Sequence, residues 1–352
     1  MNADFINPDD ARWPEVLRSM KHDCYHLPEY AEVAALEDGV KAMAFYAEKG
    51  SSACLIPLLL RPLSRELNAP PDWFDCASPY GYPGILSSSP DELHPFLDAF
   101  TSRARAHGIV SAFIRLHPLL HLDYGALEKF GTLVTHGQTV FIDLSEPNDR
   151  IWQQMSTNHR RNITRLLRTG FRCSVDDWSR YEDYIEVYHA TMQRVEAARG
   201  YFFSMRYFKA LRERLGDCLH LVCVLSDDNE LAAAGLFMAT EGIVQYHLGG
   251  TAEKYLAVAP SKLMLDFVWR WAQEQGHDVF HLGGGLGGVE DSLFQFKAGF
   301  SPLRGQFHTY RMVVDESKYA ALDQAARSLR GPDDSSAGDF FPIYRRLVGS
   351  AA

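Results

Sequence analysis

The chain has 352 residues, of which 46% are hydrophobic and 12% aromatic, and its formal net charge is −10. At about 150 residues per domain this length predicts roughly two domains, and the composition excludes a disordered protein. The longest uncharged, mostly apolar stretch, 231–240, is about half as long as a membrane-spanning helix, so we expect no integral membrane segment.

The first residues and the cysteines predict a cytoplasmic location. Residues 1–10 include acidic side chains and no apolar core of a signal peptide. The six cysteines form no C-x-x-C pair, which is typical of reduced thiols rather than of disulfides or zinc ligands, and we expect no metal site. The negative net charge excludes a protein that coats nucleic acid with its whole surface, but a local basic patch depends only on charges within roughly 8–10 Å.

Strand-like and helix-like segments alternate along the first half of the chain. We expect, in chain order, strands at 41–47 and 52–60, a helix over 90–107 with Ser89 as its N-cap, a strand at 109–116, a helix over 118–130 and a strand at 132–144.

The second half has the same rhythm. We expect one or two helices within 148–169, a strand at 171–175, helices over 181–198 and 205–215, strands at 219–225, 230–239 and 242–248, a helix over 260–275 and a buried strand at 279–282. The sequence SDDN at 226–229 favours a hairpin turn. We therefore predict two α/β lobes with mixed sheets, 1–146 and 147–315, the first completed by a C-terminal helix within about 316–352.

A basic segment opens the second lobe. Residues 151–174 contain five arginines and a histidine but no Asp or Glu. If 157–169 is helical, Arg161, Arg165 and Arg168 share one face, and Ile163, Leu166 and Leu167 lie on the other. Arg172 would continue the basic patch beyond Gly170. Guanidinium groups bind phosphate oxygens in a planar, bidentate way, so this face is a candidate site for a phosphate-bearing ligand or an RNA end. A solvated helix face, or one paired with acidic side chains, is the alternative.

Two predicted strands end in glycines, at Gly249-Gly250 and Gly283-Gly284. Glycine lets the backbone approach a ligand closely and turn its N–H groups toward an anion or a carbonyl oxygen. Neither run is a Walker loop or a dinucleotide fingerprint, and tight turns at strand ends are as good an explanation.

Lys297 stands between Phe296 and a glycine at 299 that would end a helix. In a partly dry environment its cation could neutralise a phosphate or an oxyanion that forms during acyl transfer.

Four motifs, taken in order, resemble the Fem family, the FemX/FemAB-type peptidyltransferases with related BioF2-like acyltransferases. They are NHRRNI at 158–163, YHLGGT at 246–251, HLGG at 281–284 and FKAGF at 296–300. The resemblance is clearest over 151–311 and extends more loosely to LPEY at 27–30 and SPYGYPG at 78–84.

The resemblance implies two tandem lobes of the GNAT acyltransferase fold. It also implies transfer of an amino acid from aminoacyl-tRNA to an amine, typically on a peptidoglycan precursor, with no further cofactor. Phe296 and Lys297 match the catalytic-channel pair of the family, so Lys297 would stabilise the transition state or the terminal tRNA phosphates. The arginine face and the four strand-end glycines would bind the donor.

The acceptor would be an amine, nucleotide- or lipid-linked, or a small biosynthetic amine. The segment TMQR at 191–194, with Arg194, and the more distant Tyr201 resemble the region that holds the acceptor's phosphates in the family. We add Tyr246, and Tyr80 and Tyr82 from the aromatic loop, as further acceptor-binding residues. A packed structural loop is an equally good reading of the segment around Tyr80 and Tyr82.

The sequence also departs from the family pattern. It has no charged coiled-coil arm, and APSK at 259–262 stands where acetyl-CoA enzymes of this fold have their pyrophosphate-binding loop. An acyl-CoA-dependent N-acyltransferase therefore stays an alternative, as does a non-catalytic binding protein in envelope or polysaccharide assembly. Aminolysis of an activated ester mainly needs positioning and oxyanion stabilisation, and the general base could be Asp291, Glu290 or a group of the substrate.

Overall fold

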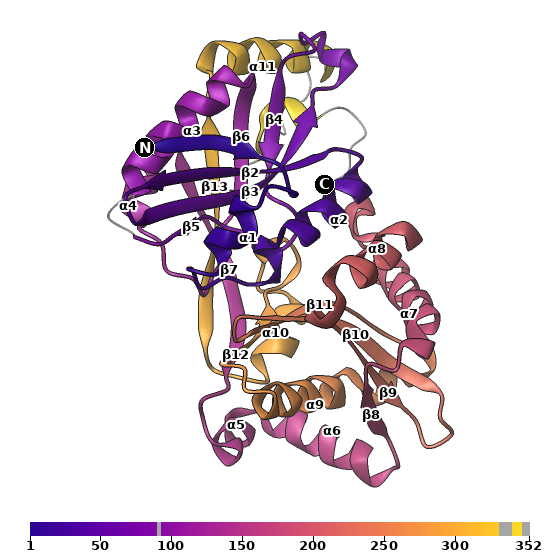
Figure 1. The fold of residues 1–352 in the computed structure, drawn as a ribbon. Coiled ribbons are helices and arrows are strands. Elements are labelled where there is room, and N and C mark those ends of the chain that lie inside the picture. Colours follow the sequence, from indigo (N-terminus) through magenta and orange to yellow (C-terminus); the bar gives the residue numbers. More distant parts are fainter. Residues whose placement is uncertain (90–92, 331–339, 347–352) are drawn as a thin grey trace. The chain divides into compact units, whose positions relative to one another are not determined.

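The computed structural model describes residues 1–89, 93–330 and 340–346, which form two compact units (Figure 1). One unit comprises Met1–Thr135 and His308–Ala352, and the other His136–Phe307. The chain passes between them inside two long strands, β7 (Thr132–Asp143) and β13 (Arg304–Val313), so these bounds differ from the expected 146/147 and 315/316. Of the expected C-terminal segment, residues 331–339 and 347–352 lie outside the described residues.

The first unit is built on a mixed sheet. Its strands follow the order β1 (Asn2–Ile6), β2 (Lys41–Lys49), β3 (Ser52–Pro62), β4 (Phe74–Ala77), β6 (Ile109–Arg115) and the second part of β13, with the two-residue β5 (Leu86–Ser87) beside β3. The strands pair antiparallel except for β4 and β6, which are parallel.

Both faces of this sheet are covered because successive side chains of a strand point to opposite faces. Phe45 of β2 packs toward α3 (Leu93–Ala106), whereas its neighbours Ala44 and Tyr46 pack toward α1 (Arg12–Leu17) and α2 (Pro28–Asp38). A smaller cluster joins β6 to α11 (Glu316–Arg330) and to a short 3-10 helix at Ile343–Arg345.

The second unit has a sheet of the same mixed kind. The order is β7, β12 (Val279–Gly283), β11 (Ile243–Thr251), β10 (Leu231–Thr240), β9 (Leu219–Leu225) and β8 (Arg172–Val175). Only β11 and β12 pair parallel in this series.

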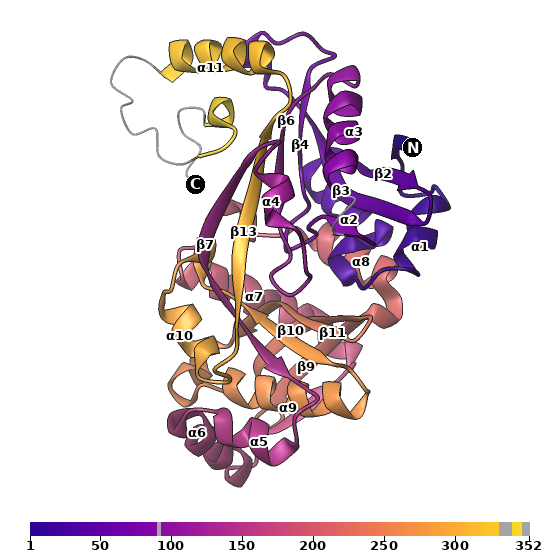
Figure 2. The ribbon, with the colours of Figure 1, turned by 90° about the vertical axis from the view of Figure 1, so that its left-hand side faces the viewer.

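Helices cover both faces of the second sheet (Figures 1 and 2). On one face lies α9 (Ser261–Glu274), whose buried Trp269 and neighbours form the core with β9–β12, and α5 (Asn148–Gln154) and α6 (Thr157–Arg168) pack beside it. On the other face lie α7 (Tyr181–Arg194) and α8 (Met205–Leu215), which contribute a group of stacked and edge-on aromatic rings.

The expected mixed α/β class is confirmed, as are the hairpin around 226–229 and the helices that became α6, α8 and α9. The expected helix over 118–130 is wrong: only α4 (Tyr124–Leu127) is helical there, because the ring of His117 accepts the N–H of Leu119 and Asp123 caps the short helix. Residues 90–92 of the helix expected over 90–107 lie outside the described residues, and the rest is α3. No helix among the described residues is long and apolar enough to cross a membrane.

Candidate functional site

A gap between two parallel strands defines the centre of the second unit. The register of β11 and β12 ends at the pair Gln245–His281, although β11 continues to Thr251. Beyond that pair Tyr246 lies opposite Phe237 of β10, and Gly283 lies opposite Val140 of β7. Beyond Gln245 and His281, β11 therefore pairs only with β10 among the described strands, and β12 pairs only with β7. The backbone groups that β11 and β12 turn toward each other there do not pair with each other.

Lys297 reaches the edge of this gap. It lies on α10 (Ser292–Ala298), is only 8% exposed, and its Nζ donates a 2.6 Å hydrogen bond to the carbonyl of Gly284, just past β12. Burial lowers the pKa of Lys297 to about 8, and the charge of Asp291 opposes that shift. The ammonium has three N–H donors, and among the described residues it donates only to Gly284. Two donors are therefore left for a ligand.

Tyr246 places an aromatic face over this ammonium. The Nζ of Lys297 lies 5.8 Å from the centroid of the Tyr246 ring, within the range of a cation–π contact. The ring is itself stacked on Phe237, at 5.2 Å between centroids, and burial raises the pKa of the Tyr246 hydroxyl to about 12. The structure therefore brings together three predicted residues, Lys297, Gly284 and Tyr246.

The loop between β12 and α10 is held by Asp291. Its carboxylate caps α10 by accepting the N–H of Phe294 at 2.9 Å, and it also accepts the N–H of Leu286 at 3.1 Å. Glu290 beside it is exposed. Of the two candidate general bases, Asp291 therefore already has a structural task, as the cap of α10.

The helix that carries Lys297 is fastened to the start of α6. Nε2 of His159 lies 2.8 Å from the carbonyl oxygen of Phe296, and the N–H of Ser156 donates to the carbonyl of Gly299 at 2.8 Å. Gly299 has to be a glycine here, because a Cβ would lie 2.5 Å from Cε1 of the His159 ring. Burial lowers the pKa of His159, so the ring is neutral and donates from Nε2 to the Phe296 carbonyl.

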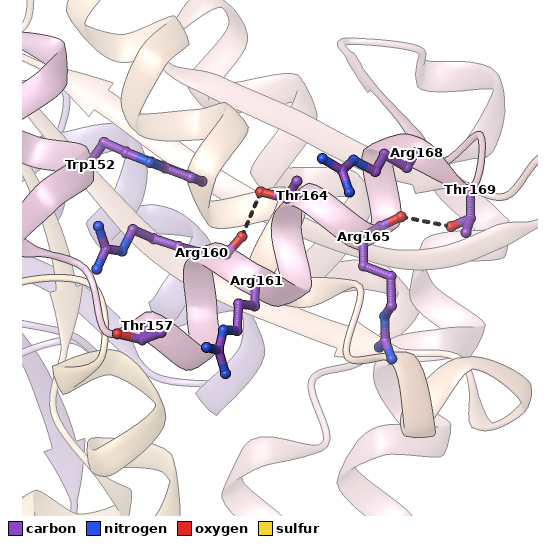
Figure 3. Close-up of a pocket in the computed structure, with 8 residues that line it drawn as sticks. All are labelled: Trp152, Thr157, Arg160, Arg161, Thr164, Arg165, Arg168 and Thr169. Carbon is purple, nitrogen blue, oxygen red and sulfur yellow. Dashed lines mark hydrogen bonds between the residues drawn. The ribbon is translucent and has the colours of Figure 1, made fainter.

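The arginines of α6 line a surface pocket of about 600 Å³. Figure 3 shows the side chains of Arg160, Arg161, Arg165 and Arg168 spreading from this helix beside Trp152. None of the four guanidinium groups makes an ion pair or a side-chain hydrogen bond with a described residue. The arginine face is therefore not neutralised by acidic side chains of the described chain.

Two details of the basic segment differ from expectation. Leu167, expected on the packed side of α6, is 56% exposed, while Ile163 and Leu166 are buried. Arg172, expected to extend the arginine face, instead donates to the side chain of Asn229 at 2.6 Å and to the carbonyl of Ser226 in the hairpin turn.

Gly249 and Gly250 lie within β11, opposite Gly235 and Ala234 of β10. A Cβ on Gly250 would lie 2.8 Å from the carbonyl oxygen of Val187 and 3.0 Å from the backbone of Tyr188, so this glycine lets α7 pack directly on the strand. This packing task accounts for Gly250, and its predicted contact with the donor stays a prediction.

Arg194 and Tyr201 lie at and just beyond the end of α7. Arg194 is exposed and donates to the hydroxyl of Thr191, which in turn accepts the N–H of Thr251 at the end of β11. Tyr201 accepts the hydroxyl of Tyr188 on its backbone carbonyl at 2.6 Å.

Tyr80 and Tyr82 belong to the first unit. The hydroxyl of Tyr30 donates to the carbonyl of Tyr80 at 2.9 Å, and the ring of Tyr25 stands edge-on to Tyr82 and fills the space beside Gly81. Both tyrosines are half-buried, so the loop is a fixed aromatic surface of that unit.

Sequence reasoning assigned no role to two buried histidines at the gap. Nδ1 of His281 donates to the side-chain oxygen of Gln245 at 2.7 Å, and Nε2 of His247 is hydrogen-bonded to the hydroxyl of Tyr207 at 2.8 Å. Burial lowers the pKa of His247 to about 3, so that ring is neutral. The sequence does contain a signal, since each histidine precedes a Leu-Gly-Gly sequence. Only the glycines of these two sequences were interpreted as functional.

The chain is similar to one protein-family model and to several solved structures. Residues 153–297 match the family model described as an acetyltransferase (GNAT) domain. The solved structure of FemX is similar with a TM-score of 0.68 and 14% identity, covering 91% of this chain and 99% of FemX. No curated protein sequence matches the chain.

Two further solved structures are also similar. L-PGS from Bacillus licheniformis has a TM-score of 0.58 and 14% identity over 90% of this chain and 96% of its own. The C-terminal domain of a putative lysylphosphatidylglycerol synthetase from Agrobacterium fabrum has a TM-score of 0.54 and 14% identity over 89% and 93%. The chain therefore contains a match to a GNAT acetyltransferase domain over 153–297 and has the fold of FemX, as the resemblance of its motifs to the Fem family predicted.

Proposed function

We propose that the protein transfers an aminoacyl group from aminoacyl-tRNA to an amine and so forms an amide bond. The observation that carries this proposal is the buried ammonium of Lys297 at the end of the paired part of β11 and β12. A cation in a dry site is worth most where negative charge develops, and ester aminolysis develops it on the carbonyl oxygen.

The reaction needs few groups from the protein. The acceptor nitrogen attacks the ester carbonyl, the new C–N bond forms, and the bond to the ribose oxygen breaks. Lys297 donates a hydrogen bond to the oxyanion of the tetrahedral intermediate, and the proton lost by the amine ends on the departing ribose hydroxyl. Phe296 is half-buried and its carbonyl is bonded to His159, and its match to the channel pair of the Fem family suggests that it would border the path of the acyl group.

The choice of donor and acceptor is supported by charge and by the comparisons. Arg161, Arg165 and Arg168 form an unneutralised basic face on the helix that is fastened to α10, as a polyphosphate donor such as tRNA requires. The strand-end glycines would add backbone contacts to that donor. Arg194, Tyr201, Tyr246, Tyr80 and Tyr82 are the candidate contacts to the acceptor, a peptidoglycan precursor or another amine.

An acyl-CoA donor is the second candidate. It is favoured by one observation, namely that the family model matching 153–297 is an acetyltransferase domain. The two hypotheses predict that different donors are consumed in the same assay, so one experiment distinguishes between them.

The test is a donor screen with purified protein and its Lys297→Ala variant. We expect the protein to consume one aminoacyl-tRNA only when an amine-bearing cell-wall precursor or polyamine is added, and the variant to lose about 10²–10³-fold in kcat. Lys129→Ala serves as the control, because this exposed lysine lies in the first unit. Consumption of an acyl-CoA instead would replace the donor, and full activity of Lys297→Ala would refute the role of Lys297.

A further inference from the structure

We infer that a groove between α7 and α8 binds a small amphiphilic zwitterion, a molecule with an ammonium and an anionic group at one end and an apolar tail at the other. Four charged side chains, Glu182, Lys209, Arg212 and Glu213, would bind the charged end. The inference goes beyond the proposed function and does not depend on the transfer reaction.

The α7–α8 groove is a cavity of about 680 Å³ between two helix faces. A volume of roughly 300–1,000 Å³ is usual for small-molecule sites. One face, at the start of α7 and the turn before it, consists of Trp178, Tyr181, Glu182 and Ile185, and the other, on α8, consists of Met205, Lys209, Arg212 and Glu213. The spacings of three and four residues within each set place its members on one side of a helix.

The four charged side chains of the groove do not neutralise one another. Among the described residues none of them makes an ion pair or a side-chain hydrogen bond, although two carboxylates and two cations line the same cavity. Lys209 and Glu213 are four residues apart, a spacing at which opposite charges can pair. The adjacent Arg180 and Asp183 do pair, at 3.3 Å. Unpaired groups of both signs around one cavity suit a ligand that has both charges.

The cation of Arg212 is held in place by aromatic rings. Its Cζ lies 4.6 Å from the centroid of the Trp178 ring and 5.8 Å from that of Tyr181. The two rings stand edge-on to each other, and the Tyr181 hydroxyl donates to the carbonyl of Phe208 at 2.7 Å. A cation–π contact positions the guanidinium group without neutralising it. Its N–H groups are therefore oriented in advance for a carboxylate or a phosphate.

The groove has a charged end and an apolar end. Because Arg212 lies over Trp178 and Tyr181, the last turns of α8 lie beside the start of α7, and the two helices run in opposite directions. The other end of the groove is formed by Ile185 and Met205. Ile185 is buried, but Met205 is 42% exposed. An apolar tail placed on these two side chains would remove the Met205 thioether from water.

The charged end of the groove lies away from the gap that Lys297 borders. The helix α7 follows β8, the edge strand of the second sheet, and the N–H of Asp176 between them donates to the carbonyl of Leu221 in β9. The gap lies between β11 and β12, further along the same sheet. A ligand at this end therefore does not contact the reacting atoms, and its binding can be measured without turnover.

Two kinds of molecule have the required chemistry. One is a free α-amino acid with a large apolar side chain, and the other is a phosphatidylethanolamine with its acyl chain. In both, the ammonium would contact Glu182 or Glu213, and the carboxylate or phosphate would contact Arg212 and Lys209. The first probe is phenylalanine and the second is lysophosphatidylethanolamine below the concentration at which it forms micelles.

The experiment follows tryptophan fluorescence while each probe is added to the full chain. We expect saturable binding of one probe, which identifies the source of the zwitterion. Ligands that lack one charge should bind about tenfold more weakly or worse, because each leaves a charged group of the groove without a partner. For phenylalanine these ligands are 3-phenylpropionate and phenethylamine, and for the lipid the ligand is lysophosphatidic acid.

Variants locate the binding in the groove. Glu182→Gln and Arg212→Met should each weaken binding of the zwitterion by about tenfold. Glu186→Gln and Arg206→Met remove exposed charges on the same two helices outside the groove, and they should bind like the unmodified protein. Glu182→Gln should not further weaken a ligand that lacks the ammonium, since the two changes remove the same contact. Lys297→Ala should keep its affinity for the probe.

Four results would overturn the inference. They are no saturable binding of either probe, equal affinities for the zwitterion and its singly charged analogues, equal affinities in the groove and control variants, and loss of binding in Lys297→Ala. The last result would place the ligand in the transfer site. A failed transfer assay, by contrast, would leave the binding result unchanged, so the two proposals are tested separately.

Discussion

Burial sets the charge of Lys297 and therefore the pH range in which it can act. Taking the ammonium out of water disfavours its charged form, which lowers the pKa from 10.5 to about 8, and the carboxylate of Asp291 only partly compensates. At neutral pH the group is still mostly cationic. It loses its proton as the pH rises through about 8, well before an exposed lysine would.

This gives a prediction for the pH profile of the transfer reaction. We expect kcat to fall as the pH rises through about 8, because neutral Lys297 is a weaker donor to the oxyanion. In Lys297→Arg any remaining activity should lack this descending limb, since a guanidinium group stays charged. Rate measurements from pH 6 to 10 check both expectations. Tyr246→Phe, which keeps the ring, is the control and should keep the limb near 8; a limb that persists in Lys297→Arg belongs to another group.

At the same scale, the sequence alone identifies a residue when the pattern that marks it lies in the adjacent sequence. The pair Phe296-Lys297 stood out because a cation was placed between apolar residues before a glycine. His247 and His281 did not, because their partners Tyr207 and Gln245 are 40 and 36 residues away, and only the fold brings them together.

At the scale of elements, the 3.6-residue periodicity of a helix correctly predicted which side chains of α6 lie together. The spacing of Arg161, Arg165 and Arg168 placed them on one face of α6, and the structure has them lining one pocket. The helix expected over 118–130 failed for a long-range reason. His117 is hydrogen-bonded to the buried carboxylate of Asp23 and accepts the N–H of Leu119, and this fixes the chain in a turn where the pattern alone favoured a helix.

The glycines of β11 allow a direct test of packing against ligand binding. Gly250→Ala would push a Cβ against the backbone of α7, whose atoms cannot move away as a flexible side-chain tip can. We expect it to lower the free energy of unfolding by about 1–3 kcal/mol, measured by denaturant titration. Gly200→Ala is the matched control, because its Cβ would meet nothing within 4 Å, and it should change stability by less than about 0.5 kcal/mol. Unchanged stability in Gly250→Ala, together with weaker donor binding, would mean that this glycine serves the ligand.

At the scale of the whole molecule, the hydrophobic cores of the two units are separate among the described residues. Phe45 belongs to the core between β2, β3 and α3, and Trp269 to the core between α9 and the second sheet. The first unit is assembled from both ends of the chain, with the buried Tyr344 of the C-terminal part hydrogen-bonded to Ser111 of β6. Sequence reasoning could predict two lobes from the repeated rhythm, but β1, β4 and β13 were missed because short or mixed segments show no clear alternation.

Because each unit has its own core, we predict that the two units lose their structure separately. Phe45→Ala leaves a cavity in the first core and should cost about 3–5 kcal/mol there, while Trp269→Ala should cost a similar amount in the second. In hydrogen exchange followed by mass spectrometry, Phe45→Ala should speed the exchange of amides in β2 and β3 and leave those of β9–β11 protected, and Trp269→Ala should do the opposite. Each variant is the control of the other. If either one accelerated exchange throughout the chain, the two units would unfold as one cooperative body, and the separate cores would not correspond to separate stabilities.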